Sequence, residues 1–311
     1  MTVSESFWVS VPATTANIGP GFDCLGAALT RYNRFRFIRT QGQTPFTIMV
    51  TGSDHDRVPT DESNLAYIAF CECFKRLAQP VPSVRLEIDL EVPLARGLGS
   101  SSTAIVGGIL GANALAGFPL TDIDLAQLAT DIEGHPDNVV PALLGGCRLA
   151  TVDEQGQGIR CGIPWHPDIV PIVVIPAFEV STAKARQVLP KHYSRTDAVY
   201  NIGHLGLLLR ALETGNGNWV RAAIGDRIHE PYRKTLIPGY DAVVQAALAV
   251  GAYGVTISGA GPTLLALGSM TEAAAIAQAM TLTWQQQGID VVDAVALKID
   301  EIGATVEAID A

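Results

Sequence analysis

The sequence predicts an α+β protein with two domains. Three observations lead to this fold class: strand patterns alternate with helical patterns, the order of these patterns differs between the two halves, and apolar residues are plentiful. The chain has 311 residues, of which 48% are hydrophobic, enough for a large core and for one or two domains. Glycine, proline and polar residues cluster without periodicity in 151–167, so we expect an N-terminal domain at 1–165 and a C-terminal domain at 166–311.

Strand patterns open the first half of the chain. Residues 83–91 alternate apolar and charged side chains, which places the apolar ones on one face and predicts a half-buried strand. Apolar residues alternate in the same way in 7–11 and 35–37, and 46–50 resembles another strand.

Helical patterns follow in the first half. Residues 62–78 have apolar side chains at helical spacing. Residues 102–116 are nearly all apolar and contain three glycines, which predicts a buried helix that its neighbours approach closely. A third helix begins at Thr121, where Asp124 gives a weak capping-box signal, and runs to about Glu133.

The second half has the order βα…αββαβ, which is typical of an α+β domain. The expected strands are 171–176, 253–258, 263–267 and 291–299. The expected helices are 181–189, 194–213, 239–250 and 271–287.

Charge and cysteine content narrow the class of protein. The chain has 21 basic and 31 acidic residues, a net charge of −10, and no long basic run, so we expect neither a nucleic-acid nor a membrane partner. Its five cysteines show no zinc-type pairing and fit a reducing cytoplasm. The N-terminus lacks the pattern of a signal peptide, and no run of about 20 apolar residues occurs.

The segment 92–104, V-P-L-A-R-G-L-G-S-S-S-T-A, joins a strand pattern to a helix pattern. Unpaired amides and the positive end of the helix dipole make such a junction an anion site, and its serines add hydroxyls for phosphate or Mg²⁺. The segment is neither a Walker A loop nor G-x-G-x-x-G. A tight turn capped by serine is the alternative interpretation.

Two further glycine-bearing stretches, Val11–Leu29 and Gly254–Leu267, occur at either end of the chain. With P-L-A-R-G-L-G-S-S-S-T-A between them, the chain resembles the GHMP kinases over essentially its whole length. This resemblance implies the two-domain GHMP kinase fold, with an N-terminal ribosomal-protein-S5-like ATP-binding domain and a C-terminal ferredoxin-like domain.

Within this family, P-A-T-T-A-N-I-G-P-G-F-D-C-L-G and E-G-H-P-D-N-V-V-P-A-L-L-G-G closely resemble the homoserine kinases. The resemblance implies an ATP:L-homoserine O-phosphotransferase that makes O-phospho-L-homoserine in threonine biosynthesis. It also implies a homodimer that uses ATP and Mg²⁺. A kinase for another small alcohol and a non-catalytic nucleotide sensor on the same fold are the alternatives.

The resemblance assigns the phosphates of ATP to the glycine- and serine-rich segment, and Mg²⁺ to a serine hydroxyl and a carboxylate. We expect Ser101 and Glu133 to hold the metal, with Ser100 as second choice for the hydroxyl. The expected ATP-binding residues are Pro93, Leu94, Ala95, Arg96, Gly97, Leu98, Gly99, Ser100, Ser101, Ser102 and Thr103.

A site for a zwitterionic amino acid needs cations for its carboxylate and an anion for its ammonium. Arg186 and Arg233 resemble the carboxylate-binding arginines of the family, and a guanidinium matches a carboxylate with two parallel hydrogen bonds. Asp23 can hold the ammonium, and Asn17 can support either end. In isolation, Arg186 would be interpreted as an exposed helix charge.

The motif H-P-D-N supplies the remaining candidates. The resemblance places His135 and Asn138 near the substrate side chain, with Asn138 oriented at the hydroxyl, and Thr182 as a donor to the γ-phosphate. A metal site, or Asp137 and Asn138 capping a turn, are the alternatives. An amide cannot take a proton at neutral pH, so we favour positioning without a strong base and keep Asp137 as the reserve base.

Overall fold

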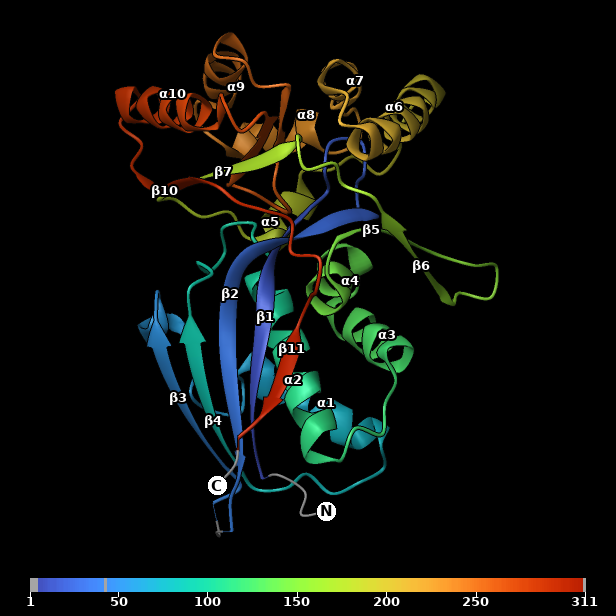
Figure 1. Cartoon of the computed structure of the whole chain (residues 1–311), viewed down its shortest axis with the longest axis vertical. Coiled ribbons are helices and arrows are strands. Elements are labelled where there is room, and N and C mark those ends of the chain that lie inside the picture. Colours follow the sequence, from blue (N-terminus) through green and yellow to red (C-terminus); the bar gives the residue numbers. More distant parts are fainter. Residues whose placement is uncertain (1–4, 42–43, 310–311) are drawn as a thin grey trace.

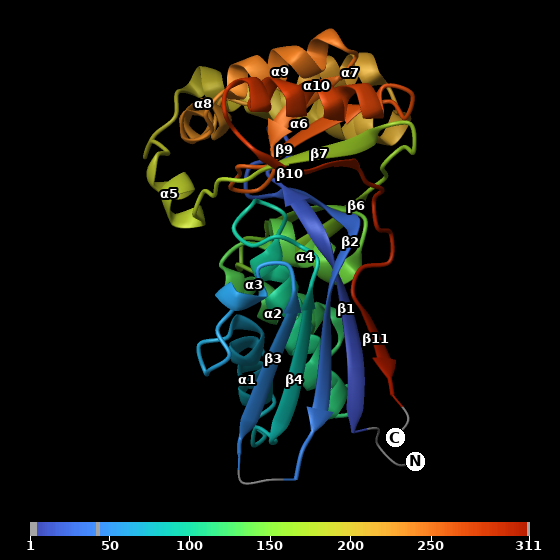
Figure 2. The same ribbon diagram turned by 90° about the vertical axis from the view of Figure 1, so that its left-hand side faces the viewer.

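The structure, a computed structural model, describes residues 5–41 and 44–309. It consists of two sheets, each covered by helices (Figure 1). The helices of the first half lie against one face of the longer sheet, and most helices of the second half cover the shorter sheet at the opposite end of the molecule, whereas α5 (Thr182–Gln187) lies to one side (Figure 2). The α+β class is confirmed.

Within the described residues, the first sheet has seven strands in the order β11-β1-β2-β4-β3, with β5 paired to β2 and β6 to β5. Strands β3 and β4 are parallel, and the other pairs are antiparallel. The strands are β1 (Ser6–Ala16), β2 (Leu25–Arg39), β3 (Phe46–Gly52), β4 (Val84–Leu90), β5 (Cys147–Val152), β6 (Gly158–Ile163) and β11 (Thr305–Ala308).

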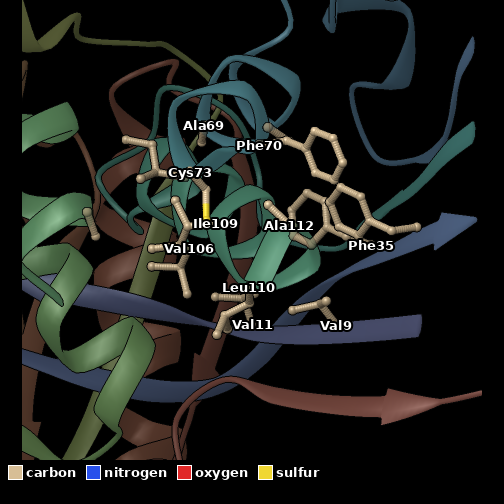
Figure 3. Packing of buried hydrophobic residues seen from close by; sticks show 14 of the residues in the cluster. Val9, Val11, Phe35, Ala69, Phe70, Cys73, Val106, Ile109, Leu110 and Ala112 are labelled. Atoms are coloured by element: carbon tan, nitrogen blue, oxygen red, sulfur yellow. The ribbon is translucent and has the colours of Figure 1, made fainter. Parts of the chain in front are cut away.

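Helix α2 (Ser100–Leu115) is buried because it is apolar almost all round. A Cβ at Gly107 would lie 2.6 Å from the Phe35 ring, and one at Gly111 would lie 2.2 Å from the Phe37 ring, so only glycine lets this helix approach β2. Figure 3 shows Val106, Ile109 and Leu110 of this helix in the resulting core. The helices here are α1 (Leu65–Arg76), α2 (Ser100–Leu115), α3 (Asp122–Glu133) and α4 (Pro136–Leu144), with the 3₁₀ turn η1 (His55–Arg57).

The second sheet has four antiparallel strands in the part of the chain that is described, in the order β10-β7-β9-β8. This is the ferredoxin-like arrangement that the resemblance implied for the second half. The strands are β7 (Val170–Pro176), β8 (Gly254–Ile257), β9 (Leu264–Gly268) and β10 (Val291–Ala296). The helical segments are α5 (Thr182–Gln187), α6 (Arg195–Thr214), α7 (Gly217–Ala223), α8 (Glu230–Arg233), η2 (Lys234–Leu236), α9 (Tyr240–Ala249) and α10 (Ala273–Gln286).

Two strand-forming segments were not expected from the sequence. The hairpin of β5 and β6 occupies part of 151–167, and β6 buries no residue, so it shows no apolar alternation. Strand β11 follows the second sheet in sequence but pairs with β1 of the first sheet. It has four residues and none of them is buried, which explains why its pattern was not recognised. The domain boundary near 165 stays a prediction.

A shared apolar cluster joins the two halves. Leu25, Val92 and Leu98 from the first half pack with Val173 and Leu265 from the second. Leu98 lies in the glycine- and serine-rich loop, so this loop is anchored where the two sheets meet. Across 5–41 and 44–309, no helix is both long and apolar enough to cross a bilayer.

Candidate active site

A cavity of about 470 Å³ lies where the three glycine-bearing stretches meet. Asn17 of the stretch 11–29, the loop before α2 and the Gly259–Gly261 turn line it, and so does the turn between α3 and α4. Predicted site residues in its lining are Asn17, Leu94, Ala95, Arg96, Gly97, Gly99, Ser100, Ser101, Glu133, His135, Asn138, Thr182, Arg186 and Arg233. The chain thus brings together residues from both halves.

The loop before α2 is held by both other glycine-bearing stretches. Gly97 has φ 78°, and a Cβ there would lie 2.2 Å from the Ser258 carbonyl oxygen. Ser258 Oγ donates to the Gly97 carbonyl at 2.6 Å, and the Thr14 amide donates to the Leu98 carbonyl at 3.1 Å. Fixed in this way, the loop places the first turn of α2 at the cavity wall.

The amino end of α2 faces the cavity with its unpaired backbone amides. Gly99 is the N-cap residue with φ 68° and, as a glycine, supplies no side chain to cap the first turn. Ser100 and Ser101 line the cavity, whereas Ser102 is fully buried. Free amides, the helix dipole and two accessible hydroxyls make this end a site for an anion such as a phosphate.

Replacing Gly99 by alanine is expected to disturb this loop. The new Cβ would lie 2.0 Å from Thr14 Oγ1, and the left-handed backbone would be strained. We expect a loss of roughly 1–3 kcal/mol from the strain, and more from the overlap. Gly117 is the matched control, since its φ is 84° and a Cβ there would meet nothing within 4 Å. Urea unfolding measures both variants, and an equal loss in both would contradict the overlap.

Glu133 ends α3 beside the serines of α2. Ser101 Oγ and Ser102 Oγ donate to Glu133 Oε1 at 3.0 and 3.1 Å. Ser101 and Glu133 line the cavity, so a hydroxyl and a carboxylate face it side by side. No group of three or more His, Cys, Asp or Glu side chains with metal-binding geometry occurs among the residues described.

The first turn of α4 carries the H-P-D-N motif. His135 Nδ1 lies 2.5 Å from Asp137 Oδ1, and the Thr14 hydroxyl donates to Asn138 Oδ1 at 2.8 Å. Burial lowers the pKa of His135, but the hydrogen bond and charge of Asp137 outweigh it and raise this pKa overall. Asp137 is 1% exposed and does not line the cavity, and its Oδ2 has no hydrogen-bond partner within the described part of the chain.

An ion pair connects the loop between β1 and β2, which we call the N-terminal loop, to α5. Arg186 donates to both oxygens of Asp23, from Nη1 at 3.0 Å and from Nη2 at 2.9 Å. This pairing raises the pKa of Arg186. Asn17 lies next to the pair, because its Oδ1 accepts from the Asp23 amide at 2.8 Å and its Nδ2 donates to the Gly259 carbonyl at 2.9 Å.

Arg233 is a buried cation, 2% exposed, at the wall of the same cavity. Its guanidinium donates to the carbonyls of Gly259 at 3.0 Å and Ala185 at 3.3 Å, and lies 5.0 Å from the centroid of the Phe22 ring. Burial lowers the pKa of Arg233. These contacts leave a fixed, desolvated positive charge that an anionic ligand group can meet.

Several predicted residues support the cavity without lining it. Asp23 is absent from the lining but pairs with Arg186, which is part of it, and its side chain is 34% exposed, whereas Asp137 is buried and bonded to His135. Also absent from the lining are Pro93, Leu98, Ser102 and Thr103 of the loop and helix. The role of each predicted site residue stays a prediction.

Sequence reasoning missed a group of ion pairs beside the cavity. Glu179 accepts from Arg57 at 2.5 and 2.9 Å and from Arg96 at 3.4 Å, which links η1, the loop before α2 and the segment after β7. Arg57 and Glu179 are 122 residues apart, and neither lies in a recognisable motif, so the sequence carries no signal for their contact.

Sequence reasoning also missed a buried polar network under the N-terminal loop. Glu230 accepts from the Thr256 hydroxyl and from the Ile257 amide at 2.9 Å. Asp226 accepts from the amides of His229 at 2.7 Å and Glu230 at 2.8 Å. In the stretch H-E-P-Y-R, the sequence indicates a functional role only for the arginine, because the hydrogen-bond partners of the histidine and the glutamate lie on distant strands and loops.

The stability of the protein is expected to depend on pH through Glu230. Burial raises its pKa from the ordinary 4.5 to about 7, although donation by Thr256 lowers it in part. The folded state therefore binds a proton at the Glu230 carboxyl more tightly than the unfolded state does. This difference stabilises the folded protein fully below about pH 4.5, and the stabilisation is lost as the pH rises through about 7. The effect is on the order of 3 kcal/mol.

Urea unfolding of the wild type and of Glu230→Gln at pH 5 and pH 8 measures this effect. Glutamine keeps the oxygen that accepts from Thr256 and cannot ionise. The wild type should lose stability relative to this variant as the pH is raised. An identical difference at both pH values would show that Glu230 does not titrate in this range.

Family models match both halves of the chain. The model of the GHMP kinases N terminal domain matches residues 64–146, and that of the GHMP kinases C terminal domain matches 208–286. The first covers the loop before α2, the H-P-D-N motif and Glu133. The second covers α8 and the Gly259–Gly261 turn.

Curated relatives and solved structures agree with these models. The homoserine kinase of Trichormus variabilis is 58% identical over 305 residues, which is 98% of this chain and 100% of the relative. That of Synechococcus sp. is 57% identical over 300 residues, 96% of this chain and 97% of the relative. A crystal structure of homoserine kinase from Cytophaga hutchinsonii has a TM-score of 0.88 and 31% identity, over 99% of both chains. The chain therefore belongs to the GHMP kinase family, and within it to the group of the homoserine kinases.

Proposed function

We propose that the chain transfers the γ-phosphoryl group of ATP to the side-chain hydroxyl of L-homoserine and forms O-phospho-L-homoserine. One observation carries the proposal: a pair of arginines and a carboxylate, suited to an amino acid, lies beside an amide-rich helix end suited to a triphosphate. Arg186, Arg233 and Asp23 form the first part, and the loop from Gly97 to Ser101 forms the second.

The Asp23–Arg186 ion pair supports a zwitterionic substrate. The α-carboxylate of a substrate can replace Asp23 as the partner of the Arg186 guanidinium, and the α-ammonium of the same molecule then pairs with Asp23. One ion pair within the protein is thus replaced by two ion pairs with the substrate, so no charge is left unpaired. Arg233 offers a second, fixed cation to the carboxylate, and Asn17 offers an amide to either group.

The reaction requires alignment and charge neutralisation more than covalent help. Amides of the loop and of the first turn of α2 bind the phosphates, and the Thr182 hydroxyl donates to the γ-phosphate. Asn138 orients the attacking hydroxyl, because its Oδ1 is fixed by Thr14 and its amide cannot take up a proton. Asp137 lies outside the cavity lining, which favours a supporting role beneath His135 over proton removal.

The residues at the amino end of α2 are compatible with Mg²⁺. Ser101 and Glu133 present a hydroxyl and a carboxylate at 3.0 Å from each other, and Mg²⁺ prefers few protein oxygens and several waters. These two side chains would hold the ion, which neutralises negative charge on the phosphates when bound.

A coupled assay that follows ADP release tests the function directly. The protein is incubated with ATP and Mg²⁺ and with L-homoserine, mevalonate or a sugar. We expect ADP release with L-homoserine and none with mevalonate or the sugar. Release only with another alcohol would reject the amino-acid site, and ATP binding without any turnover would identify a nucleotide sensor. The homodimer and the cytoplasmic location stay predictions, the first testable by sedimentation.

A further inference from the structure

The loop 17–23, which we name the substrate loop, has a backbone that needs support. Asn17, Gly19 and Asp23 have φ values of 58°, 52° and 55°, in the left-handed region. Such values at Asn and Asp persist only where surrounding contacts hold the chain. The substrate loop carries both Asn17 and Asp23, so whatever holds it also sets the position of these side chains.

Both hydrogen-bonding groups of Gly19 are bound by residues of the second half. The Gly19 amide donates to Thr256 Oγ1 at 3.0 Å. The Gly19 carbonyl lies 3.0 Å from His229 Nε2, and because a carbonyl only accepts, this nitrogen donates. The substrate loop is therefore held from two directions at its second left-handed residue.

Thr256 relays the contact to Glu230. Its hydroxyl accepts from the Gly19 amide and donates its own proton to the Glu230 carboxyl oxygen, which the Ile257 amide fixes at 2.9 Å. A hydroxyl both accepts and donates, whereas the methyl group of valine does neither. Thr256 is fully buried and Glu230 is 8% exposed, so water cannot readily replace a lost partner.

Ring contacts lie on the same path. Phe22 of the substrate loop stacks on His229, with ring centroids 5.2 Å apart and planes 21° apart. The Arg233 guanidinium lies 5.0 Å from the centroid of the Phe22 ring. The short helix α8 and its N-cap residue His229 thus place Arg233 and the substrate loop relative to each other.

We propose that Thr256, Glu230 and His229 form a buried clamp on Gly19 that positions Asp23 and Asn17 for the amino-acid substrate. They are positioning residues, since none of the three lines the cavity. The inference rests on the proposed function for the identity of the substrate. It assigns part of the amino-acid selectivity to residues that never touch the amino acid.

Thr256→Val and Thr256→Ser form the matched pair that tests the clamp. Serine keeps the hydroxyl and valine keeps the shape of threonine without it. We expect Thr256→Val to raise KM for L-homoserine about tenfold. A tenfold change corresponds to about 1.4 kcal/mol, which is about the free energy of one lost hydrogen bond. KM for ATP should stay within twofold, and Thr256→Ser should restore KM for L-homoserine to within twofold of the wild type.

A double variant tests whether the effect passes through Asp23. If the clamp acts on this carboxylate, Thr256→Val should add little to the rise in KM that Asp23→Asn causes alone. The proposal would be overturned if the rises in KM of the two single variants multiplied in the double variant. It would also be overturned if Thr256→Val raised KM for ATP as much as KM for L-homoserine. A lower melting temperature of Thr256→Val with unchanged KM would show that the hydroxyl only stabilises the fold, and would overturn it as well.

Hydrogen exchange separates failure of the clamp from failure of the proposed function. Amides of 17–23 should exchange faster in Thr256→Val than in the wild type and Thr256→Ser, without any substrate present. Unchanged exchange would overturn the clamp whatever the enzyme phosphorylates. If these amides exchange faster in Thr256→Val but the wild-type protein releases no ADP with L-homoserine, the proposed substrate is rejected and the clamp is retained as a support of the loop.

Discussion

Replacing Glu133 by glutamine is expected to lower kcat by roughly 100- to 1000-fold, which corresponds to about 3–4 kcal/mol of lost electrostatic stabilisation. Glutamine keeps the oxygen that accepts from Ser101 and Ser102 but lacks the negative charge that a divalent cation needs. Steady-state kinetics over a range of Mg²⁺ concentrations measures the effect. If Glu133 contributes mainly to metal affinity, high Mg²⁺ should restore part of kcat.

Asp131→Asn is the matched control for this prediction. Asp131 lies on the same helix and accepts a hydrogen bond from Gln127 at 2.8 Å on the exposed surface. The substitution by asparagine removes the same charge as Glu133→Gln does. It should leave kcat within twofold of the wild type. A normal kcat for Glu133→Gln at all Mg²⁺ concentrations would remove Glu133 from the proposed metal site.

Replacing Arg186 by leucine is expected to raise KM for L-homoserine about 30- to 100-fold. The variant removes one cation for the α-carboxylate and leaves Asp23 without its present partner. Loss of a hydrogen-bonded charge pair costs about 2–5 kcal/mol when buried, and we expect the lower end because the Arg186 side chain is 40% exposed. Arg186→Lys should recover only part of the loss, since an ammonium lacks the two-pronged geometry.

Lys184→Leu controls for the change of charge on α5. Lys184 is exposed on the same helix and does not line the cavity. This variant should leave both KM values within twofold of the wild type. An equal rise in KM for ATP and L-homoserine in Arg186→Leu would indicate general damage to the cavity, and an unchanged KM for L-homoserine would exclude Arg186 from the carboxylate site.

Local patterns in the sequence predicted the long elements well. Helix α2 was expected at 102–116 and spans Ser100–Leu115, and the capping box at Thr121 and Asp124 is present. These elements are recognisable because their apolar residues recur at a fixed period or because a cap spans a few residues. Helices α4, α7 and α8 were missed, since each has nine residues or fewer and little room for periodicity.

Contacts between distant residues had no local signal. Asp23 and Arg186 were each predicted to bind substrate, yet their pairing across 163 residues was not. The hydrogen bond from the Gly19 amide to the Thr256 hydroxyl spans 237 residues, and no sequence pattern distinguishes Thr256 from other strand residues. Such pairs depend on how the two sheets meet, which no pattern within one segment specifies.

By itself, the sequence determined the fold class, the family, and the loop whose amides face the cavity at the start of α2. Those features depend on residues close together in the chain, where backbone propensity and short motifs act. Only the tertiary structure decided that Arg186 pairs with Asp23, that Arg57 and Arg96 meet at Glu179, and that Gly19 is held by Thr256 and His229. The physical reason is that hydrogen bonds and ion pairs require atoms to lie within about 3–4 Å of each other, and packing between the two halves sets these distances.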